Sequence, residues 1–279
     1  HNGWYYCTKQ YSLSILHTMQ YDYLIIGGGV AGVSAAEAIR KKDPKGTIAI
    51  FTDEKYPLYS RVLLPNYLKK QISRPGVFLR LVDDYTRQNI NFHPDTRVIS
   101  MNGSEKTIHT STGDYSYGKL LIATGGHVRT WNVPGADARG VFQLQTIHDA
   151  DAITNFVKPG MKGVVVGGGF ISLEFLESFL LNAMEVTLIC RDKSFFEGKL
   201  DEMGAQLMNE NFKAHGIKVL YGKNVTEVLG GNEVKELKLD SGETLPADVI
   251  GVGIGIERNM DFLDPNIIKD ARGIQTNEY

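Results

Sequence analysis

Cysteine and metal-binding patterns are nearly absent from this 279-residue sequence. Its two cysteines, Cys7 and Cys190, are too few and too far apart for the disulfide framework of a small secreted protein. We therefore expect a reducing compartment, the cytoplasm. The seven histidines lack the HxxxH and Cys/His spacings that zinc sites use, so no metal site is expected.

Long apolar runs and a strong charge imbalance are absent as well. The longest apolar stretch, residues 170–181, contains Glu174 and Glu177, which excludes it as a membrane span. A formal net charge of −2 gives no reason to expect nucleic acid or an anionic membrane as a partner. With 42% hydrophobic and 22% charged residues, the composition is that of a globular protein large enough for two domains.

What the sequence does contain is one glycine-rich motif in two copies, YLIIGGGVAG at residues 23–32 and GVVVGGGFIS at residues 163–172. Each copy predicts a buried parallel strand, a glycine turn and a helix. Such a turn lets the backbone approach a pyrophosphate, and the helix N-terminus offers N–H groups to it. A single copy could merely connect elements of an α/β sheet. Two copies predict two dinucleotides, a pairing typical of a flavin enzyme reduced by a nicotinamide.

The first copy satisfies every position of the dinucleotide pattern. Gly27 permits the tight turn, Gly29 lets the backbone approach the pyrophosphate, and Gly32 allows close packing of helix and strand. Asp53 follows the next apolar strand, about 20 residues further on, where a carboxylate accepts hydrogen bonds from ribose hydroxyls. Glu54 is the alternative for that role.

The second copy departs from the pattern in two places. Gly167 and Gly169 are present, but Ser172 stands at the third position, where its small side chain can be tolerated. The next strand ends near Arg191 instead of an acidic residue. An arginine there pairs with a 2′-phosphate, which favours NADPH over NADH. The alternative is an Arg191 that is solvated or paired with Asp192.

The region between the copies predicts further strands and turns. Residues 107–110 and 115–117 alternate like antiparallel strands, and residues 119–122 read as a buried strand. Small residues after that strand would allow a ligand to approach the backbone. They are Ala123, Thr124 and Gly125. Residues 131–137 predict an interdomain turn.

Six segments in a fixed order resemble the FAD-dependent pyridine nucleotide–disulfide oxidoreductases. Within that family, the sequence is most similar to the branch of rubredoxin reductases and nitrite reductase flavoproteins. The matching segments extend from residue 20 to about residue 258. They are GGGVAG at 27–32, YSRVLL at 59–64, LLIATGG at 120–126, VPGAD at 133–137, GGGFISLE at 167–174 and DVIGVGI at 248–254.

The resemblance implies an α/β fold of two Rossmann-like domains with parallel sheets and small antiparallel β-meanders. We expect an FAD-binding domain at residues 19–135 and an NAD(P)-binding domain at residues 136–256. Residues 257–279 would begin a return to the FAD domain. Residues 1–18 are expected to be a disordered or non-native extension before a natural start at Met19.

The resemblance also implies the residues of both sites. In the first site, Val30 and Ala31 would join the glycines, Arg61 would lie near the flavin or the pyrophosphate, and the backbone of Val98 would meet the adenine. Residues 123–125 would lie against the cofactor.

In the second site, residues expected beside the nicotinamide nucleotide are Phe170, Ile171 and Gly253. Glu174 is the candidate catalytic residue, near the flavin–nicotinamide contact. Its alternative is an ordinary exposed helix position, since an acid in the first turn suits the helix dipole without any catalytic role.

Three departures from the family shape the expected activity. The two redox cysteines of disulfide reductases are missing, Asn66 replaces a lysine that some relatives carry, and the sequence stops before the family's second FAD motif and interface domain. The third departure makes the chain look truncated, and the full-length protein could form a homodimer.

We expect hydride transfer from NAD(P)H to FAD, then electron transfer to an external acceptor. Candidates for the acceptor are a rubredoxin- or ferredoxin-like protein, a nitrite reductase module, a quinone and O2. The alternative is a catalytically incomplete flavin- or NAD(P)-binding module or partner subunit.

Overall fold

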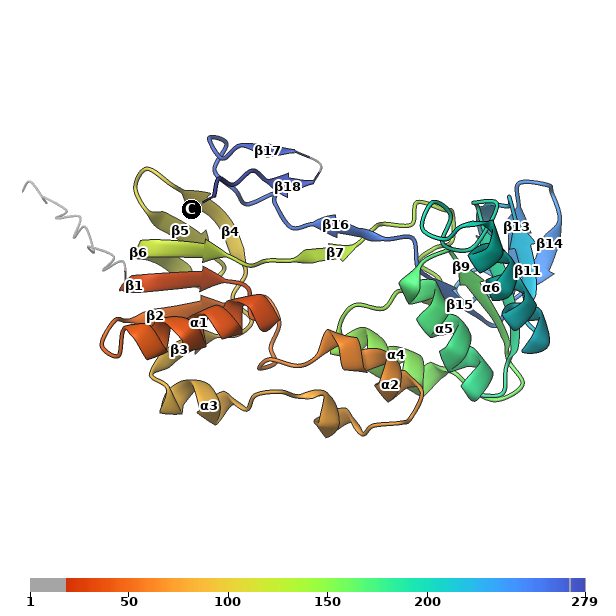
Figure 1. The fold of residues 1–279 in the computed structure, drawn as a ribbon, viewed down its shortest axis with the longest axis horizontal. Coiled ribbons are helices and arrows are strands. Elements are labelled where there is room, and N and C mark those ends of the chain that lie inside the picture. The colour runs from red at the N-terminus through yellow and green to blue at the C-terminus, as the bar shows by residue number, and fades with distance from the viewer. Residues whose placement is uncertain (1–18, 271, 279) are drawn as a thin grey trace, which may run out of the picture.

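The computed structural model describes residues 19–270 and 272–278. The extension expected at residues 1–18, with Cys7, lies outside the described residues. Two groups of elements, each built around a sheet with parallel strands, lie side by side along the longest axis (Figure 1). The expected α/β fold with two Rossmann-like units is confirmed.

The first unit contains a six-stranded sheet in the order β3-β2-β1-β6-β5-β4. Neighbours from β3 to β6 are parallel, and the pairs β6-β5 and β5-β4 are antiparallel. Helices α1 (Val30–Lys42) and α3 (Val82–Arg87) pack on β1 to β3. The strands are β1 (Met19–Ile26), β2 (Ile48–Phe51), β3 (Ile90–His93), β4 (Val98–Asn102), β5 (Thr107–Thr110) and β6 (Gly113–Ile122).

The second unit contains a parallel five-stranded sheet in the order β11-β10-β9-β15-β8 and an antiparallel sheet of β12, β13 and β14. Its strands are β8 (Val141–Phe142), β9 (Lys162–Val166), β10 (Glu185–Cys190), β11 (Lys218–Tyr221), β12 (Val225–Leu229), β13 (Glu236–Leu239), β14 (Thr244–Pro246) and β15 (Val249–Val252). Its helices are α4 (Ile147–Phe156), α5 (Phe170–Leu181) and α6 (Glu202–Ala214).

Both units use the same strand order around the glycine motif. In the first unit β1 lies between β2 and β6, and in the second β9 lies between β10 and β15. The chain therefore moves to one side of the central strand and later returns to its other side. Ligands of such sheets bind where the order reverses, at the carboxyl ends of the strands. Each glycine turn lies at such a point.

Two connections join the units. A ribbon of β7 (Gly126–Val128) and β16 (Ile256–Arg258) runs between them (Figure 1). On the other side, residues 52–80 leave the first sheet and form η1 (Arg61–Leu63), α2 (Leu64–Leu68) and η2 (Arg74–Val77). The last strands, β17 (Lys269–Asp270) and β18 (Gly273–Ile274), form a small hairpin.

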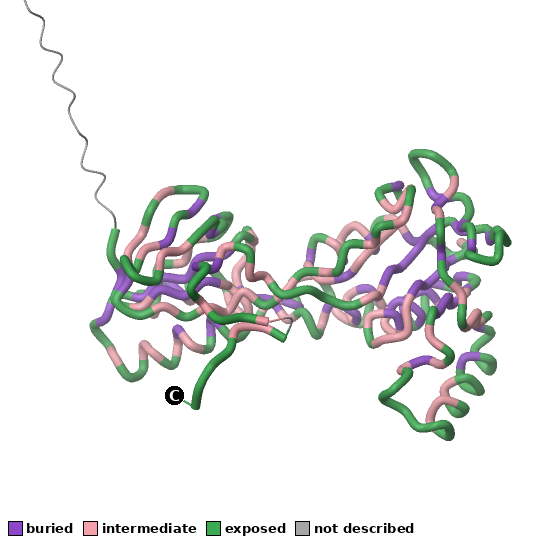
Figure 2. The backbone as a smooth tube through the Cα atoms, turned by 90° about the horizontal axis from the view of Figure 1, so that it is seen from above, coloured by how far each residue is buried: buried purple, intermediate pink, exposed green. Residues whose placement is uncertain are grey.

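The segment 52–80 contributes apolar side chains to the core of the second unit. They pack in one buried cluster with residues of α4 and α5. Buried residues occur in both units (Figure 2). The contributed residues are Tyr59, Leu64, Leu68 and Val77. One hydrophobic core therefore contains residues of the segment 52–80 together with residues of the second unit.

One detail differs from the sequence expectation. Residues 119–122 are the end of the long strand β6 and are not buried, since Leu121 is 37% exposed. The reason is that α1 packs on β1 and β2, whereas the main neighbours of β6 are the strands β1 and β5. Helix α1 begins at Val30, directly after Gly29, so the helix N-terminus reaches the glycine turn itself.

A half-buried histidine in the first unit makes stability depend on pH. His93 stacks on Phe51 with ring centroids 4.3 Å apart, and its Nε2 lies 3.1 Å from the Tyr21 hydroxyl. Burial lowers the pKa of His93. As the pH falls below about 6.5, the His93 imidazole takes up a proton in the unfolded chain before it does so in the folded protein. The free energy of unfolding is therefore unaffected by His93 above that pH. Below it, the free energy of unfolding decreases by at most about 1.4 kcal/mol per pH unit.

The measurement is urea unfolding at about pH 7.5 and about pH 5.5. We expect His93→Phe to lose less stability over this interval than the unchanged protein. The exposed His215 is the control, and the loss of stability in His93→Phe is compared with that in His215→Gln over the same interval. Equal losses in His93→Phe and the unchanged protein would contradict the assignment.

Candidate functional site

The first glycine turn is shaped by two close backbone approaches. Gly27 has φ +120°, and a Cβ there would lie 2.2 Å from the carbonyl oxygen of Ala123 at the end of β6. A Cβ on Gly32 would lie 2.0 Å from the carbonyl oxygen of Gly27. Neither position accepts a side chain, so both glycines are required by the fold of the turn.

Gly29 differs, because the space beside it is open. The nearest heavy atom to a Cβ at Gly29 is Nη1 of Arg61, 3.8 Å away. Gly29 caps α1, whose first turn contains no acidic residue. The turn therefore presents helix N–H groups together with a nearby guanidinium, the arrangement that binds a pyrophosphate.

Contacts with Glu54 and Tyr59 hold the guanidinium of Arg61 in place. Its Nη2 donates to Glu54, and its Cζ lies 5.2 Å from the ring centroid of Tyr59. The Tyr59 hydroxyl donates to Glu54 and accepts a hydrogen bond of 3.3 Å from the N–H of Ile147 at the start of α4. Burial and then the Glu54 bond raise the pKa of Tyr59, which stays protonated. Glu54 thus positions Arg61.

The other residues expected in the first site differ in exposure. Asp53 is exposed and makes no hydrogen bond or ion pair with the described residues, so its carboxylate is free to accept ribose hydroxyls. Val30 and Ala31 are exposed at the start of α1. Val98 is 8% exposed, and its side chain packs in the core, which leaves only its backbone to meet a ligand.

The second glycine turn repeats the geometry of the first. Gly167 has φ +123°, and a Cβ there would lie 2.3 Å from the carbonyl oxygen of Gly253 after β15. Gly169 caps α5, and a Cβ added to it would meet no atom within 4 Å. Ser172 is fully buried, and its Oγ donates to the Gly253 carbonyl at 3.3 Å. Serine therefore forms a bond that glycine would lack.

Side chains around the second turn are largely exposed. Phe170 is 68% exposed and contacts Phe196 with ring centroids 4.7 Å apart, while Ile171 packs partly against the core. The Arg191 side chain is 76% exposed, and its Nε lies 3.3 Å from Oδ1 of Asp192. An exposed pair of this kind contributes little to stability, so Arg191 remains available to a ligand.

Glu174 lies in the second turn of α5, and no acid occupies the first turn. Glu174 is therefore not a first-turn acid, and its role near the flavin–nicotinamide contact stays a prediction. Its Oε2 accepts a hydrogen bond of 3.1 Å from Lys69, which also bonds Glu177 at 2.6 Å. The Lys69 side chain is only 8% exposed. Burial alone would lower the pKa of Lys69, but the bonds to Glu177 and Glu174 outweigh it, and the pKa is raised.

Sequence reasoning missed Lys69 and Asn259. Lys69 directly follows α2, and its partners are more than 100 positions away in the sequence, so no local pattern identifies the contact. Asn259 follows β16 and hydrogen-bonds the turn at Thr124, 135 positions away. Lys69 ties the segment 52–80 to α5, and Asn259 ties the end of β16 to the turn after β6.

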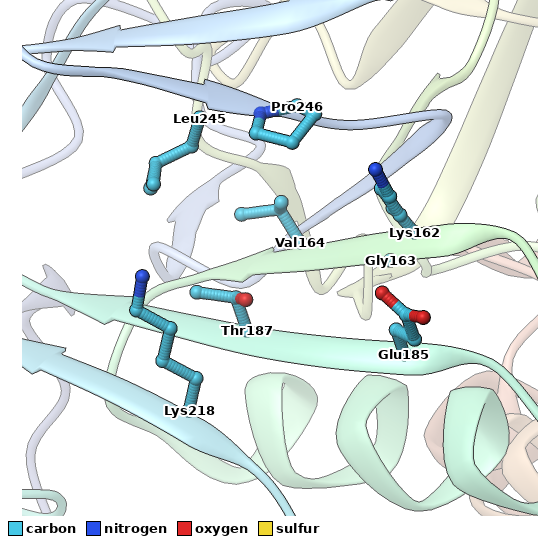
Figure 3. A pocket seen from close by; sticks show the side chains of 8 residues that line it. All are labelled: Lys162, Gly163, Val164, Glu185, Thr187, Lys218, Leu245 and Pro246. Carbon is cyan, nitrogen blue, oxygen red and sulfur yellow. The ribbon is translucent and has the colours of Figure 1, made fainter.

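A separate cavity of about 180 Å³ lies at the opposite edge of the second sheet (Figure 3). It is formed at the amino ends of β9, β10 and β11 and by β14, away from the glycine turn. Its lining residues are Lys162, Gly163, Val164, Glu185, Thr187, Lys218, Leu245 and Pro246. The cavity is therefore not part of the candidate site.

No helix among residues 19–270 and 272–278 is long and apolar enough to cross a membrane.

Known proteins similar to this chain include electron-transfer reductases. A nitrite reductase [NAD(P)H] of Bacillus subtilis (strain 168) is 30% identical over 92% of the chain and 32% of its own length. A rubredoxin-NAD(+) reductase of Ectopseudomonas oleovorans is 29% identical over 90% of the chain and 66% of its own length. The chain thus spans about a third of the first of these relatives and about two thirds of the second.

Solved structures agree with these relatives. The covalent complex of putidaredoxin reductase with putidaredoxin contains a chain that matches with a TM-score of 0.82 and 27% identity, over 87% of this chain and 60% of that one. The family model described as pyridine nucleotide-disulphide oxidoreductase matches residues 21–279. The resemblance inferred from the motifs is therefore confirmed, and the chain belongs to the pyridine nucleotide-disulphide oxidoreductase family.

Proposed function

We propose that this chain is an FAD-dependent NAD(P)H oxidoreductase that passes electrons to an external acceptor. The observation that carries the proposal is the pair of equivalent glycine turns, each at the point where strand order reverses. The first turn would hold FAD and the second the nicotinamide nucleotide. Members of the family that act as reductases support this assignment.

The residues present fit both dinucleotides. Side chains are absent where phosphates must approach, at Gly29 and Gly169, and neither α1 nor α5 has an acid in its first turn. Arg61 would add a positive charge beside the first pyrophosphate, and Asp53 would accept the ribose hydroxyls. When bound, the flavin supplies the group that accepts a hydride from the reduced nicotinamide.

The protein's own contribution is binding, orientation and exclusion of water. No thiol relay is available among the described residues, because Cys190 is their only cysteine and is buried. Burial raises the pKa of the Cys190 thiol, which keeps it protonated and unreactive. Electrons would therefore leave the first site directly, and we propose a small redox protein as acceptor, with rubredoxin-like and ferredoxin-like proteins as the first candidates.

The test is anaerobic titration of purified, FAD-reconstituted protein with NADPH and then NADH, followed by flavin absorbance. Loss of the oxidised flavin bands with either nucleotide is the expected result. Retention of FAD without any reduction would overturn the oxidoreductase proposal, and failure to retain FAD would overturn the assignment of the first turn. The reduced protein is then mixed with rubredoxin, ferredoxin, a quinone and O2 in parallel to identify the acceptor.

Arg191 is expected to select NADPH. Removing a charge-assisted contact to the 2′-phosphate in Arg191→Ala should raise the KM for NADPH about tenfold and leave the KM for NADH unchanged. Steady-state reduction rates with both nucleotides measure the effect. Lys193→Ala is the matched control, because Lys193 is exposed in the same loop. An equal change in both KM values would contradict a role at the 2′-phosphate.

A further inference from the structure

Both strands of the β7–β16 ribbon start at a cofactor turn. Strand β7 follows the turn at residues 123–125, and β16 follows the turn that begins at Gly253. The two strands pair antiparallel, with Gly126 opposite Arg258 and Val128 opposite Ile256. One short ribbon therefore connects the two candidate sites directly (Figure 1).

Asn259 ends the second crossing by binding back to the first turn. Its Nδ2 donates to the carbonyl oxygen of Thr124 at 2.9 Å, and its backbone N–H donates to the carbonyl oxygen of Gly125 at 3.2 Å. In return, the Thr124 hydroxyl donates to the Asn259 carbonyl at 3.0 Å. Three hydrogen bonds thus hold two consecutive residues of the turn.

The turn held by Asn259 touches the first glycine of the first motif. A Cβ on Gly27 would lie 2.2 Å from the carbonyl oxygen of Ala123 and 3.2 Å from the nitrogen of Thr124. The N–H of Ala123 donates to the Ile26 carbonyl at 2.8 Å, which ties the near side of the turn to β1. The Asn259 contacts tie its far side. A shift of the turn toward Gly27 would therefore meet the backbone of Gly27, and a shift away would break the hydrogen bond to Ile26.

The amide of Asn259 uses both of its polar atoms. While Nδ2 bonds Thr124, Oδ1 lies 2.6 Å from Nδ1 of His127 on β7. An aspartate would fit the same space but would place a carboxylate oxygen against the Thr124 carbonyl, which needs a donor. Leaving a part-buried carbonyl unpaired is costly, so the chemistry of this position requires an amide.

We propose that Asn259, at the end of β16, is a positioning residue that fixes the flavin-side turn at residues 123–125. The inference rests on the proposed function, since it assigns the first turn to FAD. It predicts that Asn259 controls FAD affinity and the rate of flavin reduction while leaving the affinity for NADPH unchanged, because the second glycine turn is held separately by Gly253 and Ser172.

The test compares Asn259→Ala and Asn259→Asp with Asn232→Ala. Asn232 is an exposed asparagine whose side chain makes no hydrogen bond with the described residues. We expect both Asn259 variants to raise the Kd for FAD about tenfold, measured by quenching of flavin fluorescence. At saturating FAD, they should lower the reduction rate at saturating NADPH and keep its KM within about twofold. Asn232→Ala should match the unchanged protein.

A double-mutant cycle separates positioning from general stability. Thr124→Val removes the reciprocal hydroxyl, and its effect on FAD affinity should not multiply with that of Asn259→Ala, because both act on the same turn. A lower melting temperature of the FAD-free variants with unchanged FAD affinity and rate would overturn the inference.

The outcomes also separate this inference from the proposed function. If the unchanged protein neither retains FAD nor is reduced by NADPH or NADH, the proposed function fails. If the unchanged protein does both and Asn259→Ala behaves like Asn232→Ala, only the inference about Asn259 fails.

Discussion

Gly27→Ala is expected to destabilise the protein by about 3 kcal/mol or more and to abolish FAD binding, because it combines backbone strain with overpacking. Gly27 has φ +120°, which L side chains rarely adopt, and an added Cβ would lie 2.2 Å from the backbone oxygen of Ala123. Backbone cannot yield as a flexible side chain can. Urea unfolding measures the stability, and flavin absorbance after gel filtration measures retained FAD.

Gly29→Ala is the matched control for this prediction. The nearest atom to its Cβ is the mobile end of Arg61 at 3.8 Å, so the variant should fold with nearly unchanged stability. It should still bind FAD more weakly, because the Cβ lies where a pyrophosphate would approach. A Gly27→Ala protein as stable as Gly29→Ala would show that the turn relaxes freely, against the packing described for it.

Lys69→Met is expected to lower the rate of flavin reduction at saturating NADPH about tenfold and to cost about 1–2 kcal/mol of stability. The expected loss in the free energy of unfolding is small because the Glu174 and Glu177 side chains are 32% and 51% exposed. Water therefore screens the repulsion between the two carboxylates once Lys69 is removed. The larger effect is on rate, since Lys69 holds Glu174 at 3.1 Å, and with it α5, against the segment that follows Arg61. Stopped-flow reduction and urea unfolding provide the two measurements.

Two variants check the role of Lys69. Lys69→Arg keeps a cation between the carboxylates and should recover most of the rate. Lys70→Met changes the neighbouring exposed lysine and should behave like the unchanged protein. If all three variants reduce flavin at the same rate, Lys69 is a structural residue without influence on the reaction.

Local chemistry explains which features are predictable from the sequence. Positions that need a positive φ or a close backbone contact, as at Gly27 and Gly167, can be recognised in the sequence because only glycine fits there. The helix expected after the second glycine motif is observed as α5, over the apolar stretch 170–181, since a glycine turn and the next turn enclose it. The strand order also follows from two repeated strand–turn–helix motifs.

Long-range contacts explain what the sequence could not predict. The pairing of Lys69 with Glu174 depends on how α2 meets α5, and the Asn259 clamp depends on the path of β16. Neither has a periodic or spacing signal. The apolar run at residues 119–122 predicts that Leu121 is buried, but the side chain is 37% exposed. Burial depends on whether another element covers that face of the sheet, and the local sequence does not specify this.

The packing of residues 52–80 into the second unit has a consequence for cooperativity. Cutting the chain at the linker near residue 135 would strip Tyr59, Leu64 and Leu68 from the cluster that they share with α4 and α5. The second fragment would then expose the apolar surface that these side chains cover, and the first would carry a segment without a partner. The two nucleotide-binding halves should therefore melt together in one transition, although their sheets are separate.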